Sequence, residues 1–230
     1  MGSMLDTNLR DRVADFYNSY HRHRVRTPNR WMERTYYPLL CGRTLEVGGG
    51  TLLAKSSHYV LLDLSAEAVH RAVLQGVRSV LGDGCDLPFP SRSFETVACY
   101  DVLEHVVEPH RFLSEMCRVA SRRVVVAGPN WVGRDPGGLT KYLPARVWSL
   151  LVSGGRVEAL EDPHLAFDDE WSPDSDALSA VNAGWVAGRI REAGLHIRHL
   201  RSWEYGYHLL NRLPGQRCLG PFMFVVGERG

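Results

Sequence analysis

Lysine, cysteine pairs, net charge and long apolar runs are all scarce in this chain of 230 residues. Lysine occurs twice against 25 arginines, and the 27 basic residues nearly balance the 26 acidic ones. The formal charge of +1 provides no overall field to attract polyanions, which argues against nucleic acid or an anionic membrane as a partner. The basic run HRHRVR at residues 21–26 is an exception, and we interpret it as a solvated helix end.

The five cysteines are too scattered to indicate a disulfide framework. No two of them form a C-x-x-C pair and their number is odd, as expected for reduced thiols in a cytoplasm. No apolar run approaches the roughly 20 residues of a membrane-spanning helix, and no apolar signal-peptide region is visible near the N-terminus. The sequence therefore predicts a cytoplasmic protein without a membrane partner.

The composition, 44% hydrophobic and 23% charged, is that of a folded chain with one sizeable core. Residues 1–40 carry two amphipathic stretches broken at Thr27 and Pro28, which predicts a helical cap. Residues 41–230 follow as the main unit, and we expect a single structural domain. Within it, residues 131–176 are rich in Gly, Pro, Asp and Trp, which is typical of a lid insert over a substrate.

Apolar strand-like runs alternate with helical patterns through the middle of the chain. This alternation predicts parallel βαβ units, and hence an α/β fold with a doubly wound sheet. The expected strands lie at 43–47, 58–63, 77–83, 94–101 and 122–128, with helices at 65–75 and 108–120, then a helix ending at Gly194, a strand behind it and a closing strand within 220–229.

Three glycines, Gly48, Gly49 and Gly50, directly follow the first expected strand. Ligands of parallel sheets bind beyond the carboxyl ends of the strands, where glycine permits a close approach of the backbone. A glycine triplet alone is equally explained by a tight turn. However, Asp63 ends the next expected strand, 17 positions after Glu46, where its carboxylate can accept two hydrogen bonds from a ribose diol. Together these features predict a nucleotide-bearing cofactor.

A third signal, GDGCDLPFPSRSFETVACYDVLEHV, occupies residues 82–106. It completes an ordered series of four motifs, E-x-G-x-G, D-L-S, D-x-x-x-L-P-F and D-V-L-E-H. In these motifs the chain resembles the class I S-adenosylmethionine-dependent methyltransferases, in particular the small-molecule group called type 11, over residues 43–130 and again at 185–195. The resemblance implies a Rossmann-like methyltransferase fold, with a mostly parallel seven-stranded sheet whose last strand is antiparallel, N-terminal helices and a lid insert.

The resemblance also implies S-adenosyl-L-methionine as cofactor, S-adenosyl-L-homocysteine as its product, and a set of cofactor contacts. Glu46 and the glycine loop would lie under the methionine moiety, with Glu46 near its amino end. Asp63 would hold the ribose hydroxyls, and Asp83 would accept from the adenine amino group. The other implied contacts are Leu64 against the adenine, Gly84 and Cys85 at the ring edge, Tyr100 and Asp101 below the methionine portion, and Tyr17 or Tyr20 as a cover.

Two features depart from the pattern of the family. Leu52 occupies its third glycine position, and the span from Glu46 to Asp63 is short, so we expect a stunted crossover helix near residues 53–57. A short helix offers few aligned amides to a pyrophosphate. Leu53 also replaces the third glycine of the dinucleotide-binding pattern G-x-G-x-x-G. Both points weigh more heavily against an NAD(P)-dependent oxidoreductase than against a methyltransferase.

Asp101, Glu104 and His105 are spaced i, i+3 and i+4, so a helix would present all three on one face. His105 is the first candidate for a general base, His164 the second, with Glu104 behind them. These side chains also resemble the magnesium-binding face of small-RNA 2′-O-methyltransferases and ubiquinone-pathway O-methyltransferases, with His164 as a further ligand. The same D-V-L-E-H occurs in relatives without metal, and we therefore expect no metal here.

We conclude from the sequence that the chain transfers a methyl group by in-line displacement to a small-molecule acceptor, in bacterial secondary metabolism. Three alternatives stay open: a metal-assisted O-methyltransferase acting on RNA or a quinone, a methyltransferase-fold protein that binds the cofactor without methylating, and an NAD(P)-dependent oxidoreductase. The sequence is compatible with a monomer or a homodimer, and does not specify whether oxygen, nitrogen or carbon is methylated.

Overall fold

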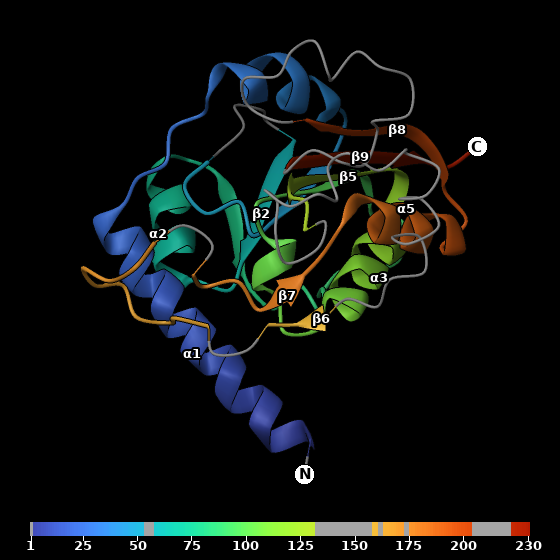
Figure 1. The fold of residues 1–230 in the computed structure, drawn as a ribbon. Helices are drawn as coiled ribbons and strands as arrows, with labels where there is room; N and C mark the ends of the chain where they lie inside the picture. The colour runs from blue at the N-terminus through green and yellow to red at the C-terminus, as the bar shows by residue number, and fades with distance from the viewer. Residues whose placement is uncertain (1, 53–57, 132–157, 161–162, 173–174, 204–221) are drawn as a thin grey trace.

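A seven-stranded sheet forms the centre of the computed structural model, which describes residues 2–52, 58–131, 158–160, 163–172, 175–203 and 222–230 (Figure 1). The strand order is β3-β2-β1-β4-β5-β9-β8. β9 runs antiparallel to both of its neighbours, while the pairs among β1 to β5 are parallel, which confirms the predicted sheet. The strands are β1 Thr44–Val47, β2 Tyr59–Asp63, β3 Arg78–Leu81, β4 Phe94–Tyr100, β5 Ala120–Pro129, β8 His196–Trp203 and β9 Phe222–Glu228.

The order of the strands reverses beside β1, and this reversal fixes where a ligand can bind. β1 pairs with β2 on one side and with β4 on the other, both in parallel. The chain therefore winds outward in one direction through β2 and β3, and in the other through β4 and β5. In doubly wound sheets, the crevice at this switch point, beyond the carboxyl ends of the strands, is the usual ligand site.

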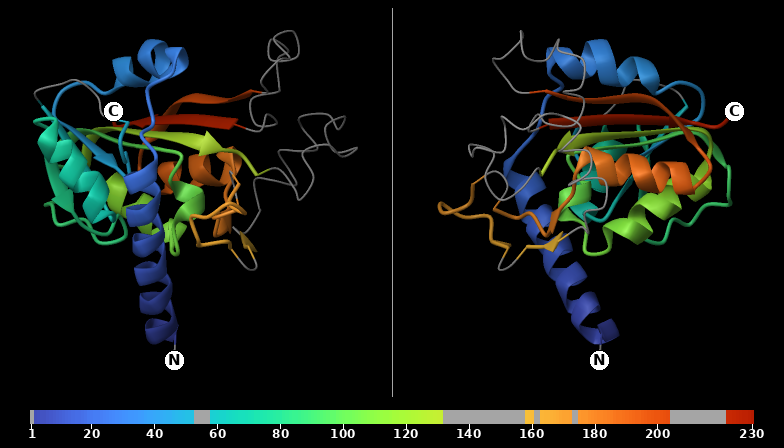
Figure 2. Two further views of the ribbon diagram at one scale, coloured as in Figure 1. Left: turned by 90° about the vertical axis from the view of Figure 1, so that its left-hand side faces the viewer. Right: turned by 45° about the vertical axis from the view of Figure 1, so that its right-hand side comes forward.

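Helices cover both faces of the sheet, as Figure 2 shows. On one face Met32 and Tyr36 pack with Ala72 of α2 in one buried cluster. On the other, Phe112 of α3 and Ile190 of α5 belong to a second buried cluster. The helical elements are α1 Gly2–His23, the π-helical turn η1 Met32–Tyr36, the 3-10 turns η2 Tyr37–Leu39 and η3 Leu103–His105, α2 Ala66–Leu74, α3 Pro109–Val119 and α5 Ala183–Glu192.

Local side chains explain where several helices begin. The Ser65 hydroxyl accepts a hydrogen bond from the amide of Ala68 at 3.2 Å, and so caps the first turn of α2. Asn182 caps α5 in the same way, through the amide of Trp185 at 2.9 Å. Both predicted helices at 65–75 and 108–120 end within one residue of the observed ones.

The second N-terminal stretch differs from the expected α-helix. It forms the π-helical turn η1 followed directly by the 3-10 turn η2. Pro38 lies at the start of η2 and has no amide hydrogen, so it cannot continue an α-helical hydrogen-bond ladder. The expected crossover helix at residues 53–57 and most of the insert at 131–176 lie outside the described residues.

A small second sheet, which the sequence did not predict, pairs β6 Glu158–Ala159 with β7 Ser179–Ala180. Because these strands are two residues long, they carry no readable alternation of polar and apolar side chains. None of the helices in the described ranges is both long and apolar enough to cross a membrane.

Candidate active site

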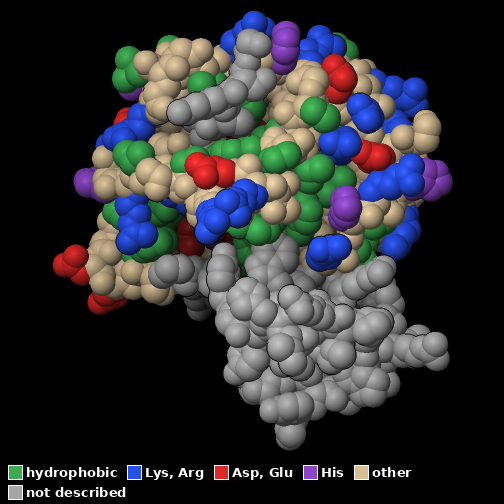
Figure 3. Space-filling view, turned by 90° about the horizontal axis from the view of Figure 1, so that it is seen from above, with side chains coloured by type: hydrophobic (Ala, Val, Ile, Leu, Met, Phe, Trp, Pro, Cys, Tyr) green, Lys and Arg blue, Asp and Glu red, His purple; other side chains and the backbone are tan. Residues whose placement is uncertain are grey.

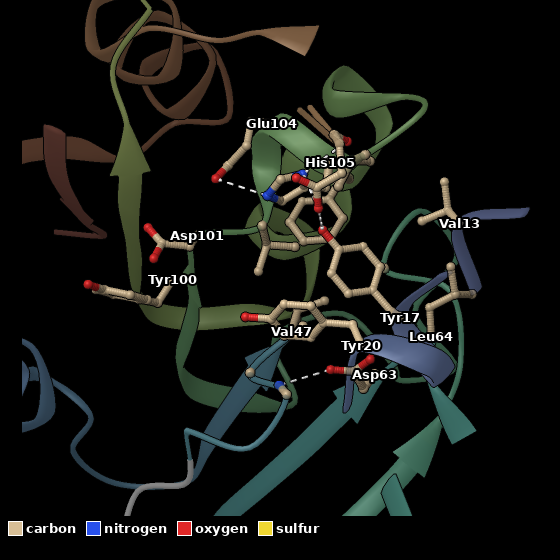
Figure 4. Close-up of a pocket in the computed structure, with 18 of the residues that line it drawn as sticks. Val13, Tyr17, Tyr20, Val47, Asp63, Leu64, Tyr100, Asp101, Glu104 and His105 are labelled. Atoms are coloured by element: carbon tan, nitrogen blue, oxygen red, sulfur yellow. Dashed lines mark hydrogen bonds and ion pairs between the residues drawn. The ribbon is translucent and has the colours of Figure 1, made fainter. Parts of the chain in front are cut away.

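A cavity of about 570 Å³ lies at the carboxyl ends of β1, β2 and β4, beside the switch point of the sheet. This volume is in the range of small-ligand sites. Of the cofactor residues predicted from the sequence, all but Glu46 line it. Figure 4 shows Asp63 and Leu64 at one end of the pocket and Glu104 and His105 at the other. The sequence motifs that lie far apart along the chain therefore meet around one space.

The glycine loop needs its glycines because of its backbone conformation. Gly48 has φ +75° and Gly50 has φ +57°, a region that L-residues rarely adopt. The amide of Gly50 donates to Oδ2 of Asp63 at 3.0 Å, and the amide of Ser65 donates to Oδ1 at 2.8 Å. These bonds hold the loop against the end of β2. Burial raises the pKa of Asp63 to about 6, although the backbone amides favour its charged form.

Glu46 lies behind the glycine loop rather than in the cavity wall. It is fully buried, accepting a hydrogen bond from the Tyr36 hydroxyl at 2.9 Å and another from the Tyr59 hydroxyl at 2.5 Å. A Cβ atom placed on Gly49 would lie 3.2 Å from the Glu46 carboxyl carbon, so the side chain packs directly beneath the loop. Glu46 therefore lies under the loop expected to hold the methionine moiety but outside the cavity wall, and its expected place near the amino end of the cofactor stays a prediction.

Burial raises the pKa of Glu46 to about 7 from its ordinary 4.5. The folded state therefore loses stability as the pH rises from about 4.5 through 7, by roughly 3 kcal/mol in total. We predict that Glu46→Gln, which removes this titration, flattens the decline of the thermal midpoint between pH 5 and pH 8. The raised pKa of the buried Asp63 also makes the folded state less stable as the pH rises, but it does so equally in wild type and in Glu46→Gln. Thermal unfolding at several pH values measures the difference.

A matched control for this prediction is Glu192→Gln, because the Glu192 side chain is 57% exposed. Its midpoint should follow that of the wild type across the pH range. Parallel curves for wild type and Glu46→Gln would contradict the assigned shift in the pKa of Glu46.

His105 lies between two buried carboxylates at the opposite end of the cavity. Its Nε2 atom is 3.4 Å from Oε1 of Glu104, and its Nδ1 atom is 3.5 Å from Oδ2 of Asp176. The Tyr17 hydroxyl donates to the same Asp176 oxygen at 2.7 Å (Figure 4). Burial lowers the pKa of His105, but the charges of Glu104 and Asp176 outweigh it, and the net shift is upward. The imidazole therefore holds a proton more tightly than a free histidine.

The predicted helical face of Asp101, Glu104 and His105 is wrong. Asp101 has φ +51° and precedes η3, a single 3-10 turn, so it shares no α-helical face with the other two. Its Oδ2 atom instead accepts from Nη2 of Arg26 at 2.7 Å. This left-handed backbone position is one that aspartate tolerates better than most residues.

His164 is not brought to the cavity in this structure. Its Nε2 atom lies 3.0 Å from Oδ1 of Asp168, in an exposed pair, and it is not among the residues of the cavity wall. The alternative metal set of Asp101, Glu104, His105 and His164 is therefore not assembled. Within the described ranges, no group of three His, Cys, Asp or Glu side chains is arranged so that it could hold a metal ion.

Several wall residues were missed by the sequence analysis. Arg10 of α1 lies 3.4 Å from Asp83 through its Nη1 atom and also pairs with Glu108. His21 is buried and Arg26 half-buried in the cavity wall, whereas residues 22–25 are exposed, so the interpretation of residues 21–26 as a solvated helix end is wrong only for the first and last residue. The spacing of Tyr17 and His21, four residues apart on α1, was the available signal, because such residues share a helical face.

Comparison with known proteins agrees with this geometry. A methyltransferase domain model matches residues 45–127. The chain is 37% identical over 111 residues to phosphatidylethanolamine N-methyltransferase from Cereibacter sphaeroides, covering 43% of this chain and 55% of that protein. It is 31% identical over 106 residues to ajmaline N-methyltransferase from Rauvolfia serpentina, covering 40% of this chain and 36% of that protein.

Among solved structures, the N-terminal domain of EvdMO1 with S-adenosylhomocysteine bound superposes with a TM-score of 0.54 at 20% identity, covering 86% of this chain and 79% of that one. This likeness concerns the fold, while the match to the family model concerns residues 45–127, which include β1 to β4 and most of β5. Residues 45–127 thus match the methyltransferase domain family, and the relatives that the chain resembles over this part are S-adenosylmethionine-dependent methyltransferases by sequence and by fold.

Proposed function

We propose that this chain transfers a methyl group from S-adenosylmethionine to a small-molecule acceptor. One observation carries the proposal: the glycine loop, Asp63 and Asp83 border a single cavity at the switch point of the sheet. The chain spans about half the length of phosphatidylethanolamine N-methyltransferase and about a third of the length of ajmaline N-methyltransferase. The activity therefore rests on the site and the family together.

The residues of the cavity wall can contact the ribose, the adenine and the methionine portion of this cofactor. Asp63 offers a carboxylate to a ribose diol, and the backbone amides of Gly50 and Ser65 hold that carboxylate in place. Asp83 accepts the amide of Cys85 at 2.7 Å, which forms a turn suited to the adenine edge. Asp101 and the glycine loop would then face the methionine portion. When bound, S-adenosylmethionine supplies an electrophilic methyl group on a sulfonium.

We assign the proton-accepting role to His105, because it lines the cavity between two carboxylates that can orient the imidazole. Asp176 is a positioning residue in this proposal, since it acts through His105, and Tyr17 fixes Asp176 in turn. Trp171 lies in the same cavity wall and supplies an apolar surface for an acceptor. Residues 131–176 would form a lid insert on the acceptor side, within the methyltransferase domain at 41–230. Residues 1–40 would form the N-terminal cap of this domain.

A base that holds its proton tightly gives a defined pH profile. His105 is active only when neutral, so turnover should rise with pH and reach half its maximum above the ordinary pKa of 6.5. Removing the Asp176 charge in Asp176→Asn should lower the pKa of His105 and move this midpoint toward acid. Steady-state turnover at saturating substrate, measured from pH 5 to pH 9, tests the shift.

Asp168→Asn serves as the control for the pH profile, because Asp168 contacts the exposed His164 rather than His105. Its midpoint should equal that of the wild type. An unchanged midpoint in Asp176→Asn would show that the two groups are not coupled in catalysis.

Amines are the acceptor class we favour. Two buried carboxylates, Glu104 and Asp176, border the cavity with a single histidine between them, which leaves this end acidic even when His105 is protonated. An acidic, partly aromatic wall suits an organic ammonium group. The two named relatives are both N-methyltransferases by name. An RNA acceptor is less well supported, because basic side chains on the face in Figure 3 are interspersed with acidic, hydrophobic and neutral ones.

The proposed function is tested by incubating the protein with S-adenosylmethionine carrying an isotopically labelled methyl group and a panel of amines, phenols and carbon acids. Mass spectrometry should detect an acceptor that gains one labelled methyl group, and Asp63→Ala should abolish the product. Cofactor binding without labelled product from a broad panel would instead favour a protein that binds the cofactor and does not methylate.

A further inference from the structure

Aromatic side chains join the C-terminal end of α1 to the described segment at residues 163–172. The centre of the Tyr20 ring lies 5.3 Å from that of Phe167 and 5.6 Å from that of Trp171. The amide of Arg24 donates to the Tyr20 carbonyl at 2.8 Å, and its guanidinium carbon lies 4.6 Å from the centre of a Trp171 ring. Tyr20, Arg24 and Trp171 all line the cavity, and Arg24 is exposed. A cation and an aromatic surface therefore meet at the rim of the cavity.

Arg24 differs from the other arginines of the cavity wall in having no carboxylate partner within the described part of the chain. Arg10 pairs with Asp83, and Arg26 pairs with Asp101. The Arg24 guanidinium contacts only aromatic rings among the described residues. Aromatic faces leave the guanidinium N–H groups free, so they are available to an oxyanion of a ligand, which they can bind through two parallel hydrogen bonds.

Trp171 provides a second, independent sign of a ligand at the rim. Its Nε1 atom is buried without a hydrogen-bond partner among the described residues. Buried polar atoms in folded proteins nearly always have a partner, and an indole N–H can only donate. A ligand group that satisfies this atom must therefore carry an acceptor, as an oxyanion does. The exposed Asp169 and Glu170 precede Trp171 in the chain but do not line the cavity.

A row of aromatic rings links this rim to the acidic end of the cavity. The Tyr17 ring lies 5.7 Å from the His105 ring and 5.9 Å from the Tyr20 ring, centre to centre (Figure 4). Tyr20 in turn contacts Trp171. Two buried carboxylates border the His105 end, whereas Arg24 brings a positive charge to the other. The two ends of the row therefore favour ligand groups of opposite charge.

We propose that the acceptor is an amine that also carries an oxyanion, either a carboxylate or a phosphate, and that Arg24 and the indole N–H of Trp171 bind this anion at the rim. The inference rests on the proposed function and narrows its acceptor class. The amino group would lie near His105, and the rest of the acceptor would follow the tyrosine rings to the rim. The two charges also orient the acceptor, because only one direction matches both ends.

Three amines with the same skeleton isolate the effect of the anion: tyramine, its phosphate ester 4-(2-aminoethyl)phenyl phosphate, and 4-(2-aminoethyl)benzoate. Each is titrated into the full chain saturated with S-adenosylhomocysteine, which has no methyl group to transfer. The wild type should bind at least one of the anionic amines roughly 10- to 100-fold more tightly than tyramine, the effect of a charge-assisted contact. Isothermal titration calorimetry gives the three dissociation constants, and the two anionic amines distinguish phosphate from carboxylate.

Substitutions at the rim should remove this preference without a general loss of binding. Arg24→Gln should abolish the preference and change the binding of tyramine by less than about twofold. Arg24→Lys keeps the charge and should keep part of the preference. Trp171→Phe keeps an aromatic ring but removes the N–H group, and should reduce the preference by a smaller factor. Arg22→Gln is the matched control, because Arg22 is an exposed arginine of the same segment outside the cavity wall, and it should bind all three amines as the wild type does.

The inference is overturned if the wild type binds tyramine as tightly as both anionic amines, if it binds none of the three, or if the preference survives in Arg24→Gln. An equal loss of affinity for all three amines in Arg24→Gln also overturns it, since that pattern marks Arg24 as a structural contact between α1 and residues 163–172. If the wild type does not bind S-adenosylhomocysteine in the absence of any amine, the proposed function itself fails, and that result is distinct from the others.

Discussion

Replacing Asp63 with alanine should weaken the binding of S-adenosylhomocysteine by roughly 100- to 1000-fold. The carboxylate is placed to accept two hydrogen bonds from the ribose diol, and each charge-assisted bond contributes on the order of 1.5–3 kcal/mol. Alanine also releases the amides of Gly50 and Ser65, which loosens the glycine loop. Calorimetric titration of wild type and variant measures the loss directly.

Two further variants show whether this loss is specific to Asp63. Asp63→Asn keeps the shape and one acceptor oxygen for the loop but loses the charge, so its affinity should fall between those of wild type and Asp63→Ala. Asp86→Ala removes a nearby exposed carboxylate and should bind as the wild type does. An Asp63→Ala protein that remains folded, judged by its circular dichroism, and binds S-adenosylhomocysteine with undiminished affinity would contradict the ribose assignment.

Replacing His105 with alanine should lower turnover by at least about 100-fold while changing cofactor affinity by less than about twofold. General base catalysis by a positioned histidine contributes roughly 10²- to 10⁴-fold to a rate. The imidazole lies at the far end of the cavity from Asp63, and so should contribute little to binding of the nucleoside (Figure 4). Turnover is measured with the acceptor found by mass spectrometry, and affinity by calorimetry.

His70→Ala is the control for His105, because His70 is an exposed histidine on α2. It should leave turnover and affinity as they are. Equal losses of turnover and of cofactor affinity in His105→Ala would mean that the residue supports the pocket rather than accepting a proton.

The sheet was predictable because buried parallel strands carry continuous apolar runs and are separated by amphipathic helices. The closing strand could also be predicted, because the resemblance to a family implied its antiparallel direction. The second N-terminal helix was not, because a π-helical turn and a 3-10 turn have the same apolar spacing as a short α-helix over so few residues. Here Pro38 was the local clue to the change of geometry.

Half of the candidate site could be predicted for the same reason, because its residues lie at the ends of strands. The residues that the sequence analysis missed do not lie at the ends of strands. Arg26 sits in a basic run that looks solvated until the chain folds back over the glycine loop. Asp176 lies at the end of an acidic stretch and reaches His105 only through tertiary packing. Asp101 was predicted on a helical face, which its left-handed backbone rules out.

One cavity at the switch point of the sheet should hold S-adenosylmethionine, and a crystal structure with S-adenosylhomocysteine bound would show whether it does. We predict the adenine beside Asp83, the ribose on Asp63 and the sulfur between the glycine loop and His105. A ligand that binds elsewhere, or in this cavity with its ribose away from Asp63, would contradict the account.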